Sequence, residues 1–328
     1  MKIDIHCHYT PRNCLDLIDP AGQKFGPSIV KDETGQEILV ADGSRLGHIG
    51  RQAYDAKTQL KDMDRIGIDI RAISPAPFSF FYHIDPELCL STSKIHNDSI
   101  AQVVNAYPDR FFGIATVPMQ DINKAILELE RTVNELGFKG VEISSNINGK
   151  NLDEPEFLPF YETAQALGIP IIVHPYYVVG TERLKRHYLS NLVGNPVDTT
   201  IAIASIIFGG IVERFPKLKW VFVHAGGAAP YIKGRWDHAY YHGVVVEFDI
   251  PKPPTEYFKT LYLDTVAHSQ PALTYLINTH GADHVVLGSD YPFDMSDPNP
   301  VNTVKKQGLS ARDEAKILGQ NAAALLGL

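Results

Sequence analysis

The chain has 328 residues, of which 44% are hydrophobic and 21% are charged, a composition that excludes disordered, collagen-like and fibrous proteins. Its formal net charge of -8 and the lack of any Lys or Arg run argue against nucleic acid as a partner and favour a small molecule. The longest apolar stretch, residues 201–212, is shorter than the roughly 20 residues that span a membrane. We therefore expect no membrane association.

The amino-terminal residues and the cysteines predict a cytoplasmic protein. Asp4 stands where a secretory leader would have its apolar segment. The three cysteines, Cys7, Cys14 and Cys89, are too few for a disulfide framework in a chain of this length, and they have no C-x-x-C spacing. Both features fit a reducing compartment.

Short β-rich runs alternate with amphipathic helical patterns along the chain, as in parallel βα units. The predicted strands lie at residues 2–7, 70–74, 111–117, 140–144, 170–174, 219–224, 261–264 and 284–288. The predicted helices lie at residues 58–65, 86–106, 123–136, 158–167, 199–214, 229–240, 271–279, 300–306 and 311–326. Eight βα units predict an α/β fold, a (β/α)₈ TIM barrel formed by residues 1–328 as a single domain.

An open, doubly wound sheet is the alternative architecture. Such a sheet normally has fewer strands, and it often has a Gly-rich phosphate loop after the first strand. In this chain His6-Cys7-His8 stands at that place. The closed barrel therefore agrees better with the sequence.

Residues 9–56 separate the first strand from the first barrel helix and interrupt the βα pattern. Structureless loops of this length are uncommon in compact proteins. Turn signals at Pro20-Ala21-Gly22 and Asp32-Glu33-Thr34-Gly35 precede the apolar run Ile38-Leu39-Val40. We expect a small β-hairpin insertion that acts as a lid on the barrel mouth.

Histidines and an aspartate stand at the carboxyl ends of the predicted strands. His6 and His8 end the first strand, where side chains at i and i+2 point to the same face. His174, His224 and Asp290 directly follow the apolar runs of the fifth, sixth and eighth strands. A lone His-x-His pair is more often an exposed or core pair than a metal site. Here, however, a histidine or an aspartate also ends three other strands at the active-site end of the barrel. Because buried polar groups need partners, this arrangement favours a shared metal ion.

This order of residues resembles the amidohydrolase superfamily. Further motifs, Val-His-Pro, His-Ala-Gly-Gly, Gly-Arg-Trp-Asp and Leu-Gly-Ser-Asp-Tyr-Pro-Phe, are similar to the branch that contains α-amino-β-carboxymuconate-ε-semialdehyde decarboxylase. The likeness spans nearly the whole chain. It implies a barrel enzyme with one Zn²⁺ per subunit that most often catalyses non-oxidative decarboxylation, although some relatives are hydrolases or hydratases.

The resemblance also implies a role for each strand-end residue. The implied metal ligands are His6, His8, His174 and Asp290. His224 matches the acid/base histidine of the family. Three imidazoles and one carboxylate leave an open coordination position, as catalytic zinc sites require. Two-metal relatives have a bridging lysine at the end of the fourth strand, but residues 140–144 contain no lysine, so we expect one metal ion.

The same resemblance implies residues that bind a small carboxylic acid substrate. Arg235 matches an arginine that reaches the substrate carboxylate of the neighbouring subunit, which implies a homodimer. Arg51, in the insertion, aligns with a second carboxylate-binding arginine. Tyr176, His268 and Phe78 follow strand ends and are expected to line the pocket, although each could instead pack against the barrel.

We therefore predict a zinc-dependent non-oxidative decarboxylase of a carboxylated unsaturated or aromatic acid. Mn²⁺ or another divalent ion is an alternative cofactor, because ligand type alone does not select the metal. A hydrolase acting on an amide, lactone or C–C bond, with Asp290 accepting the proton of water, would use the same ligands. A hydratase is a third alternative. A barrel whose metal is only structural is disfavoured by the spare His224.

Overall fold

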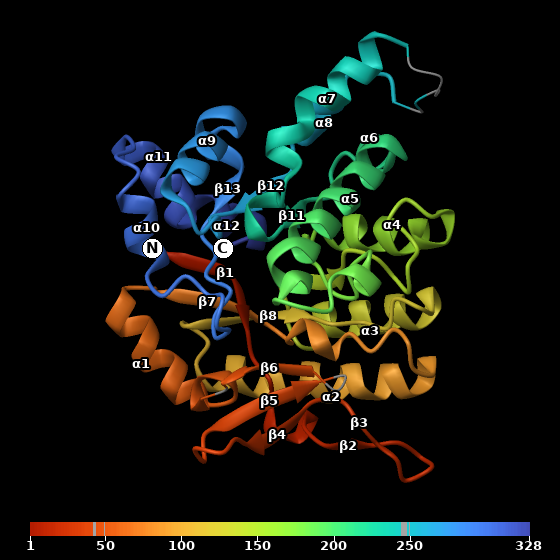
Figure 1. Ribbon diagram of the computed structural model, residues 1–328, viewed down its shortest axis with the longest axis vertical. Coiled ribbons are helices and arrows are strands. Elements are labelled where there is room, and N and C mark those ends of the chain that lie inside the picture. Colours follow the sequence, from red (N-terminus) through yellow and green to blue (C-terminus); the bar gives the residue numbers. More distant parts are fainter. Residues whose placement is uncertain (42–43, 49, 244–247, 249) are drawn as a thin grey trace.

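A closed barrel of eight parallel strands forms the centre of the computed structural model, which describes residues 1–328 apart from 42–43, 49, 244–247 and 249 (Figure 1). In chain order the barrel strands are β1 (Ile3–His8), β7 (Ile70–Ser74), β8 (Phe111–Ala115), β9 (Gly140–Ser144), β10 (Ile171–His174), β11 (Trp220–Phe222), β12 (Tyr262–Asp264) and β13 (Val285–Val286). Two backbone hydrogen bonds, Ile5 N to Leu287 O at 3.0 Å and His8 N to Tyr291 O at 2.7 Å, close the barrel. The predicted (β/α)₈ fold is confirmed.

Helices cover the outside of the barrel. They are α1 (Ala56–Ile66), α2 (Pro86–Ala106), α3 (Ile122–Asn134), α4 (Leu158–Leu167), α5 (Asn195–Phe208), α6 (Ile211–Arg214), α7 (Ala229–Tyr241), α8 (Pro254–Phe258), α9 (Gln270–His280), α10 (Pro300–Lys305), α11 (Ala311–Ala315) and α12 (Asn321–Leu326). Caps set their ends: Asp85 accepts hydrogen bonds from the backbone N–H groups of Glu87 and Leu88, and Gly168 ends α4 with φ 70°. The helix predicted at 199–214 breaks in two, because Gly210 has φ 71°.

Alternate residues of barrel strands such as β10 contribute to two separate cores. Ile171 and Val173 of β10 belong to the large cluster that packs the strands against the surrounding helices. Ile172, between them, joins the cluster inside the barrel, where Leu325 of α12 also packs. Because the interior is filled by side chains, only the carboxyl ends of the strands leave room for a site.

The insertion between β1 and α1 contains two small antiparallel sheets. One pairs β2 (Leu17–Ile18) with β3 (Lys24–Phe25), and the other contains β4 (Ser28–Lys31), β5 (Glu37–Ala41) and β6 (Ser44–His48). These strands lie at the end of the molecule opposite α7 and α8 (Figure 1). Leu39 of β5 packs with Phe78, which follows β7. The insertion thus contacts residues at the barrel mouth, and its action as a lid stays a prediction.

One helical stretch, Ser190–Phe208, is long and apolar enough to cross a membrane by length and composition alone, and 39% of it is buried within the protein. It includes α5, whose residues Ala202, Ile203 and Ile206 are fully buried in the main core. Its apolar character is therefore that of a helix covering the barrel.

Candidate functional site

Five side chains from four strand ends converge at the mouth of the barrel. Oδ1 of Asp290 lies 3.2 Å from Nε2 of His6, 3.3 Å from Nε2 of His8 and 4.0 Å from Nε2 of His174. Oδ2, the other oxygen of Asp290, lies 3.4 Å from Nε2 of His224. The five strand-end residues singled out in the sequence are thus brought together.

Four of the converging atoms are buried and have no hydrogen-bond partner among the residues that the structure describes. They are Nε2 of His6, His8 and His174, and Oδ1 of Asp290. Two ligand atoms bound at about 2.0–2.1 Å to a tetrahedral ion are separated by roughly 3.3 Å, which agrees with the two shortest separations here. One possible ligand group, His6, His174, His224 and Asp290, has its ligand atoms within 4.8 Å of one another. The donor set therefore fits one divalent cation.

Hydrogen bonds on the opposite ring nitrogens orient two of these imidazoles. Nδ1 of His6 lies 2.6 Å from Oδ2 of the buried Asp264. Nδ1 of His8 lies 3.1 Å from Oγ of Ser74, whose hydroxyl donates to Glu142 at 2.8 Å. Because that hydroxyl proton is used by Glu142, Ser74 accepts from His8. Both rings then carry the proton on Nδ1 and present the lone pair of Nε2 to the centre.

The charges of the site favour cation binding. Burial alone would raise the pKa of Asp290, but the neighbouring imidazoles, His6 first, hold it well below its usual range. Burial lowers the pKa of His174 to about 3, so its ring is neutral near pH 7. Burial also raises the pKa of Glu142, beneath Ser74. An ionised carboxylate beside a neutral imidazole is a suitable donor pair for Zn²⁺ or Mn²⁺.

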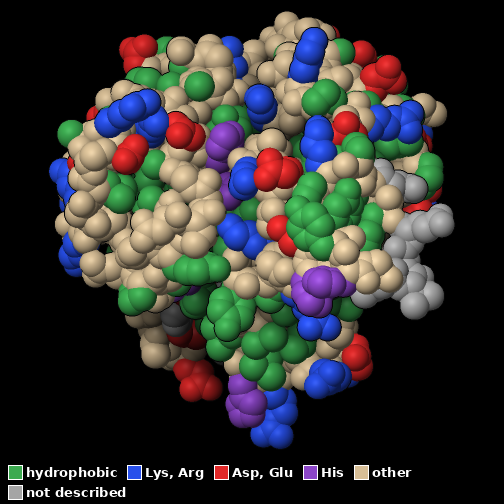
Figure 2. All heavy atoms as spheres, turned by 90° about the horizontal axis from the view of Figure 1, so that it is seen from above, with side chains coloured by type: hydrophobic (Ala, Val, Ile, Leu, Met, Phe, Trp, Pro, Cys, Tyr) green, Lys and Arg blue, Asp and Glu red, His purple; other side chains and the backbone are tan. Residues whose placement is uncertain are grey.

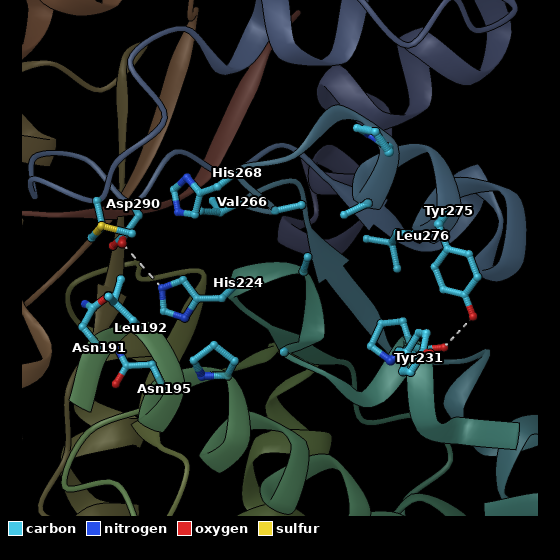
Figure 3. Close-up of a pocket in the computed structure, with 18 residues that line it drawn as sticks. Asn191, Leu192, Asn195, His224, Tyr231, Val266, His268, Tyr275, Leu276 and Asp290 are labelled. Atoms are coloured by element: carbon cyan, nitrogen blue, oxygen red, sulfur yellow. Dashed lines mark hydrogen bonds and ion pairs between the residues drawn. The ribbon is translucent and has the colours of Figure 1, made fainter. Parts of the chain in front are cut away.

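His224 stands at the start of a sharply bent loop. It has φ 53°, Ala225 has φ 55°, and Gly226 and Gly227 follow with φ 72° and 61°. The His-Ala-Gly-Gly sequence fits this path, because glycine adopts positive φ without strain. The bend turns the imidazole toward Asp290 on the wall of the cavity (Figure 3).

Two adjoining cavities reach this site, and both are bordered by His224 and Asp290. The smaller, of about 90 Å³, is bordered by Phe78, Tyr176 and Phe293 together with His174 and Asp290. The larger, of about 670 Å³, extends from His224 past His268 toward Tyr231 and Tyr275 (Figure 3). The predicted pocket residues Phe78, Tyr176 and His268 therefore all line a cavity that Asp290 also borders.

The two predicted arginines lie elsewhere. Arg235 is exposed on α7, and Arg51 is exposed just after the insertion sheet. Neither borders either cavity, and no Lys or Arg is among the described residues that line them. The described residues of one chain therefore offer no cationic side chain at these two cavities for a substrate carboxylate.

Sequence reasoning missed several residues of the site. Asp264 ends β12 and directly contacts His6, and it follows an apolar strand as Asp290 does, so the same strand-end signal could have identified it. Asn191, in the π-helical turn before α5, and Asn195, the first residue of α5, border both cavities. Nothing in the local sequence distinguishes these asparagines from surface residues.

The sequence profile of the amidohydrolase family matches residues 3–328. The chain belongs to the amidohydrolase family. A 2-amino-3-carboxymuconate-6-semialdehyde decarboxylase from Dictyostelium discoideum is 35% identical over 100% of this chain and 92% of its own length. A 2-keto-4-carboxy-3-hexenedioate hydratase from Sphingobium is 28% identical, covering 88% and 83%. A dihydroxybenzoic acid decarboxylase from Polaromonas, solved with manganese and an inhibitor, is 26% identical with a TM-score of 0.83, covering 100% and 97%.

Proposed function

We propose that this family member is a metal-dependent, non-oxidative decarboxylase of a carboxylated unsaturated or aromatic acid. The observation that carries the proposal is the convergence of four buried, unpartnered ligand atoms beside His224, which faces the other oxygen of Asp290. The names of the decarboxylase relatives support this reaction class. The cavity beside the ligand atoms is large enough for a small acid.

His6, His8, His174 and Asp290 would hold one divalent ion, which we propose to be zinc. When bound, the ion supplies positive charge that polarises and fixes oxygens of the substrate. The ligand types also suit manganese, which the Polaromonas relative binds. Elemental analysis of protein grown with both metals distinguishes the two.

His224 would move the proton of the reaction. Its imidazole borders the cavity and would deliver a proton to the carbon that bears the carboxylate. The bond from that carbon to the carboxylate then breaks, its electron pair restores the conjugation of the substrate, and CO₂ leaves. One proton enters for each CO₂ released. Phe78 and Tyr176 would hold the planar substrate next to the ligand atoms.

A second copy of the chain would supply the cation for the substrate carboxylate. We propose that Arg235 acts in trans within a homodimer, because no Lys or Arg is among the described residues that line the cavities. The rim of the larger cavity is apolar and exposed, with Tyr231 82% and Leu192 51% accessible. Figure 2, which views the molecule of Figure 1 from above, shows hydrophobic side chains gathered in patches on that face. Arg51 is proposed as a further contact from the insertion.

Hydration of a double bond is the second candidate function. It is favoured by one observation, the similarity to a hydratase over 88% of the chain. Hydration and hydrolysis add water and release no CO₂, whereas decarboxylation releases CO₂. Measurement of CO₂ during turnover therefore separates the candidates.

Two substitutions test the assigned roles. Asp290→Ala should lose both the bound metal and the activity, since it removes a ligand and leaves three imidazoles without their anion. His224→Ala should retain the metal and lose about 10² to 10⁴-fold in turnover, the usual contribution of a general acid or base. His238→Ala, which removes an exposed imidazole on α7, is the matched control. Normal turnover by His224→Ala would refute the proposed proton transfer.

A further inference from the structure

Asp264 contacts two parts of the site at once. The residue is fully buried at the end of β12. Its Oδ2 lies 2.6 Å from Nδ1 of His6. Its Oδ1 accepts hydrogen bonds from the backbone N–H of Ala225 at 2.7 Å and of Val266 at 3.0 Å. One carboxylate therefore binds both a ligand imidazole and the residue that follows His224.

The loop that carries His224 requires such an anchor. Left-handed backbone at a residue other than glycine is strained, and two such residues, His224 and Ala225, stand side by side here. Strained backbone persists only where surrounding contacts determine it. The bond from Ala225 N–H to Asp264 holds the middle of the bend, and a bond from Ala228 N–H to Thr200 at 2.9 Å holds its end.

We propose that Asp264 is a positioning residue that fixes the orientation of His6 and the path of the His224 loop together. The inference rests on the metal-binding role of His6 and the proton-transfer role of His224 proposed above. Through Asp264, the direction of a metal ligand and the placement of the acid/base are set by a single side chain. A displacement of His6 is then transmitted to the loop that carries His224, and a displacement of the loop is transmitted to His6.

An asparagine cannot replace this carboxylate. If the amide oxygen faces Ala225 and Val266, the amide nitrogen donates to Nδ1 of His6, which moves the ring proton to Nε2 and blocks metal ligation. If the amide flips, its oxygen accepts from His6, but its N–H₂ group meets two backbone N–H donors. Either orientation breaks one of the two connections directly, and the proposed coupling through this single side chain predicts that the other connection weakens with it.

The test uses Asp264→Asn and measures two quantities that need no substrate. Titration of metal-free protein with Mn²⁺ should give an affinity about 10 to 100-fold below wild type, as for other residues that orient metal ligands. At saturating metal, the backbone amide of Ala225 should exchange with deuterium faster than in wild type. Because neither readout depends on turnover, failure of the decarboxylase assignment would leave both results interpretable.

Glu128→Gln is the matched control. Glu128 is a buried carboxylate on α3 that accepts a hydrogen bond from Asn97 at 2.7 Å and lies in the helical layer. The control should lose stability and keep wild-type affinity for Mn²⁺. Wild-type affinity and wild-type exchange in Asp264→Asn would overturn the proposal, and a change in only one of them would overturn the coupling. If Asp264→Asn does not fold, rapid exchange of the Ala225 amide in the wild-type protein overturns the anchor, and slow exchange supports it.

Discussion

Protonation of a buried histidine on α2 should make this protein sensitive to moderate acid. His96 is fully buried, and neither of its ring nitrogens has a hydrogen-bond partner among the described residues. Burial lowers its pKa from 6.5 to about 3. Between those values the unfolded chain binds a proton that the folded protein does not, so the free energy of unfolding falls as the pH decreases.

The size of the effect follows from the two pKa values. From about pH 7.5 to about pH 5.5, a group that titrates at 6.5 only in the unfolded state lowers the free energy of unfolding by roughly 1.4 kcal/mol. His96→Met removes the titrating ring and fills the site with a flexible apolar side chain. The pH dependence of the variant should therefore be smaller than that of wild type by this amount.

Urea unfolding at the two pH values, followed by tryptophan fluorescence, measures the difference. Comparison of variant with wild type cancels the contributions of all other titrating groups, including the histidines at the barrel mouth. His238→Gln, which removes an exposed imidazole, is the control and should retain the wild-type pH dependence. Equal pH dependence of His96→Met and wild type would refute the reasoning.

Three further predictions concern the site. Mixing inactive Arg235→Ala and His224→Ala chains should restore activity if subunits exchange, because each hybrid dimer then contains one intact site. Confirmed subunit exchange without recovered activity would exclude Arg235 from the site. Gly227→Ala should lower the free energy of unfolding by about 1–3 kcal/mol and reduce turnover, because Gly227 has φ 61° and an added Cβ would lie 2.2 Å from the carbonyl oxygen of Pro196. An unchanged urea midpoint would contradict this prediction. Removal of metal by a chelator should lower the melting temperature, and addition of one equivalent of Zn²⁺ per chain should restore it. A requirement for two equivalents of Zn²⁺ would contradict a site for a single metal ion.

The barrel could be predicted from the sequence because each βα unit has its own local signal. Apolar runs of strand length alternate with amphipathic helices, and their order alone determines which strands are neighbours. Strand ends were less predictable. The sixth strand, expected to reach His224, ends at Phe222, because the positive φ angles of the following loop end its pairing. The final helix, expected at 311–326, consists of α11, a π-helical turn and α12.

The candidate site was predictable only in part, for a related reason. The barrel fold brings the carboxyl ends of its strands together irrespective of the conformation of the loops. The five candidate residues stand at such strand ends: His6, His8, His174, His224 and Asp290. The residues that orient them depend on three-dimensional contacts. Glu142 and Ser74 are 68 positions apart in sequence, so no local pattern predicts that one accepts a hydrogen bond from the other. A residue that acts in a neighbouring subunit leaves no sign within its own chain beyond exposure.

The central claim is that one protein-bound metal ion and His224 together replace a carboxylate by a proton. The most direct measurement follows metal-loaded protein in D₂O with carboxyl-¹³C-labelled aromatic and muconate-type acids, recording ¹³CO₂ and deuterium in the product. We predict one deuterium, at the carbon that carried the carboxylate, for each ¹³CO₂ released, with no release from metal-free protein and a loss of at least about 10²-fold in His224→Ala. Metal-dependent consumption of an acid with no ¹³CO₂, or with oxygen from water in the product, would contradict the account.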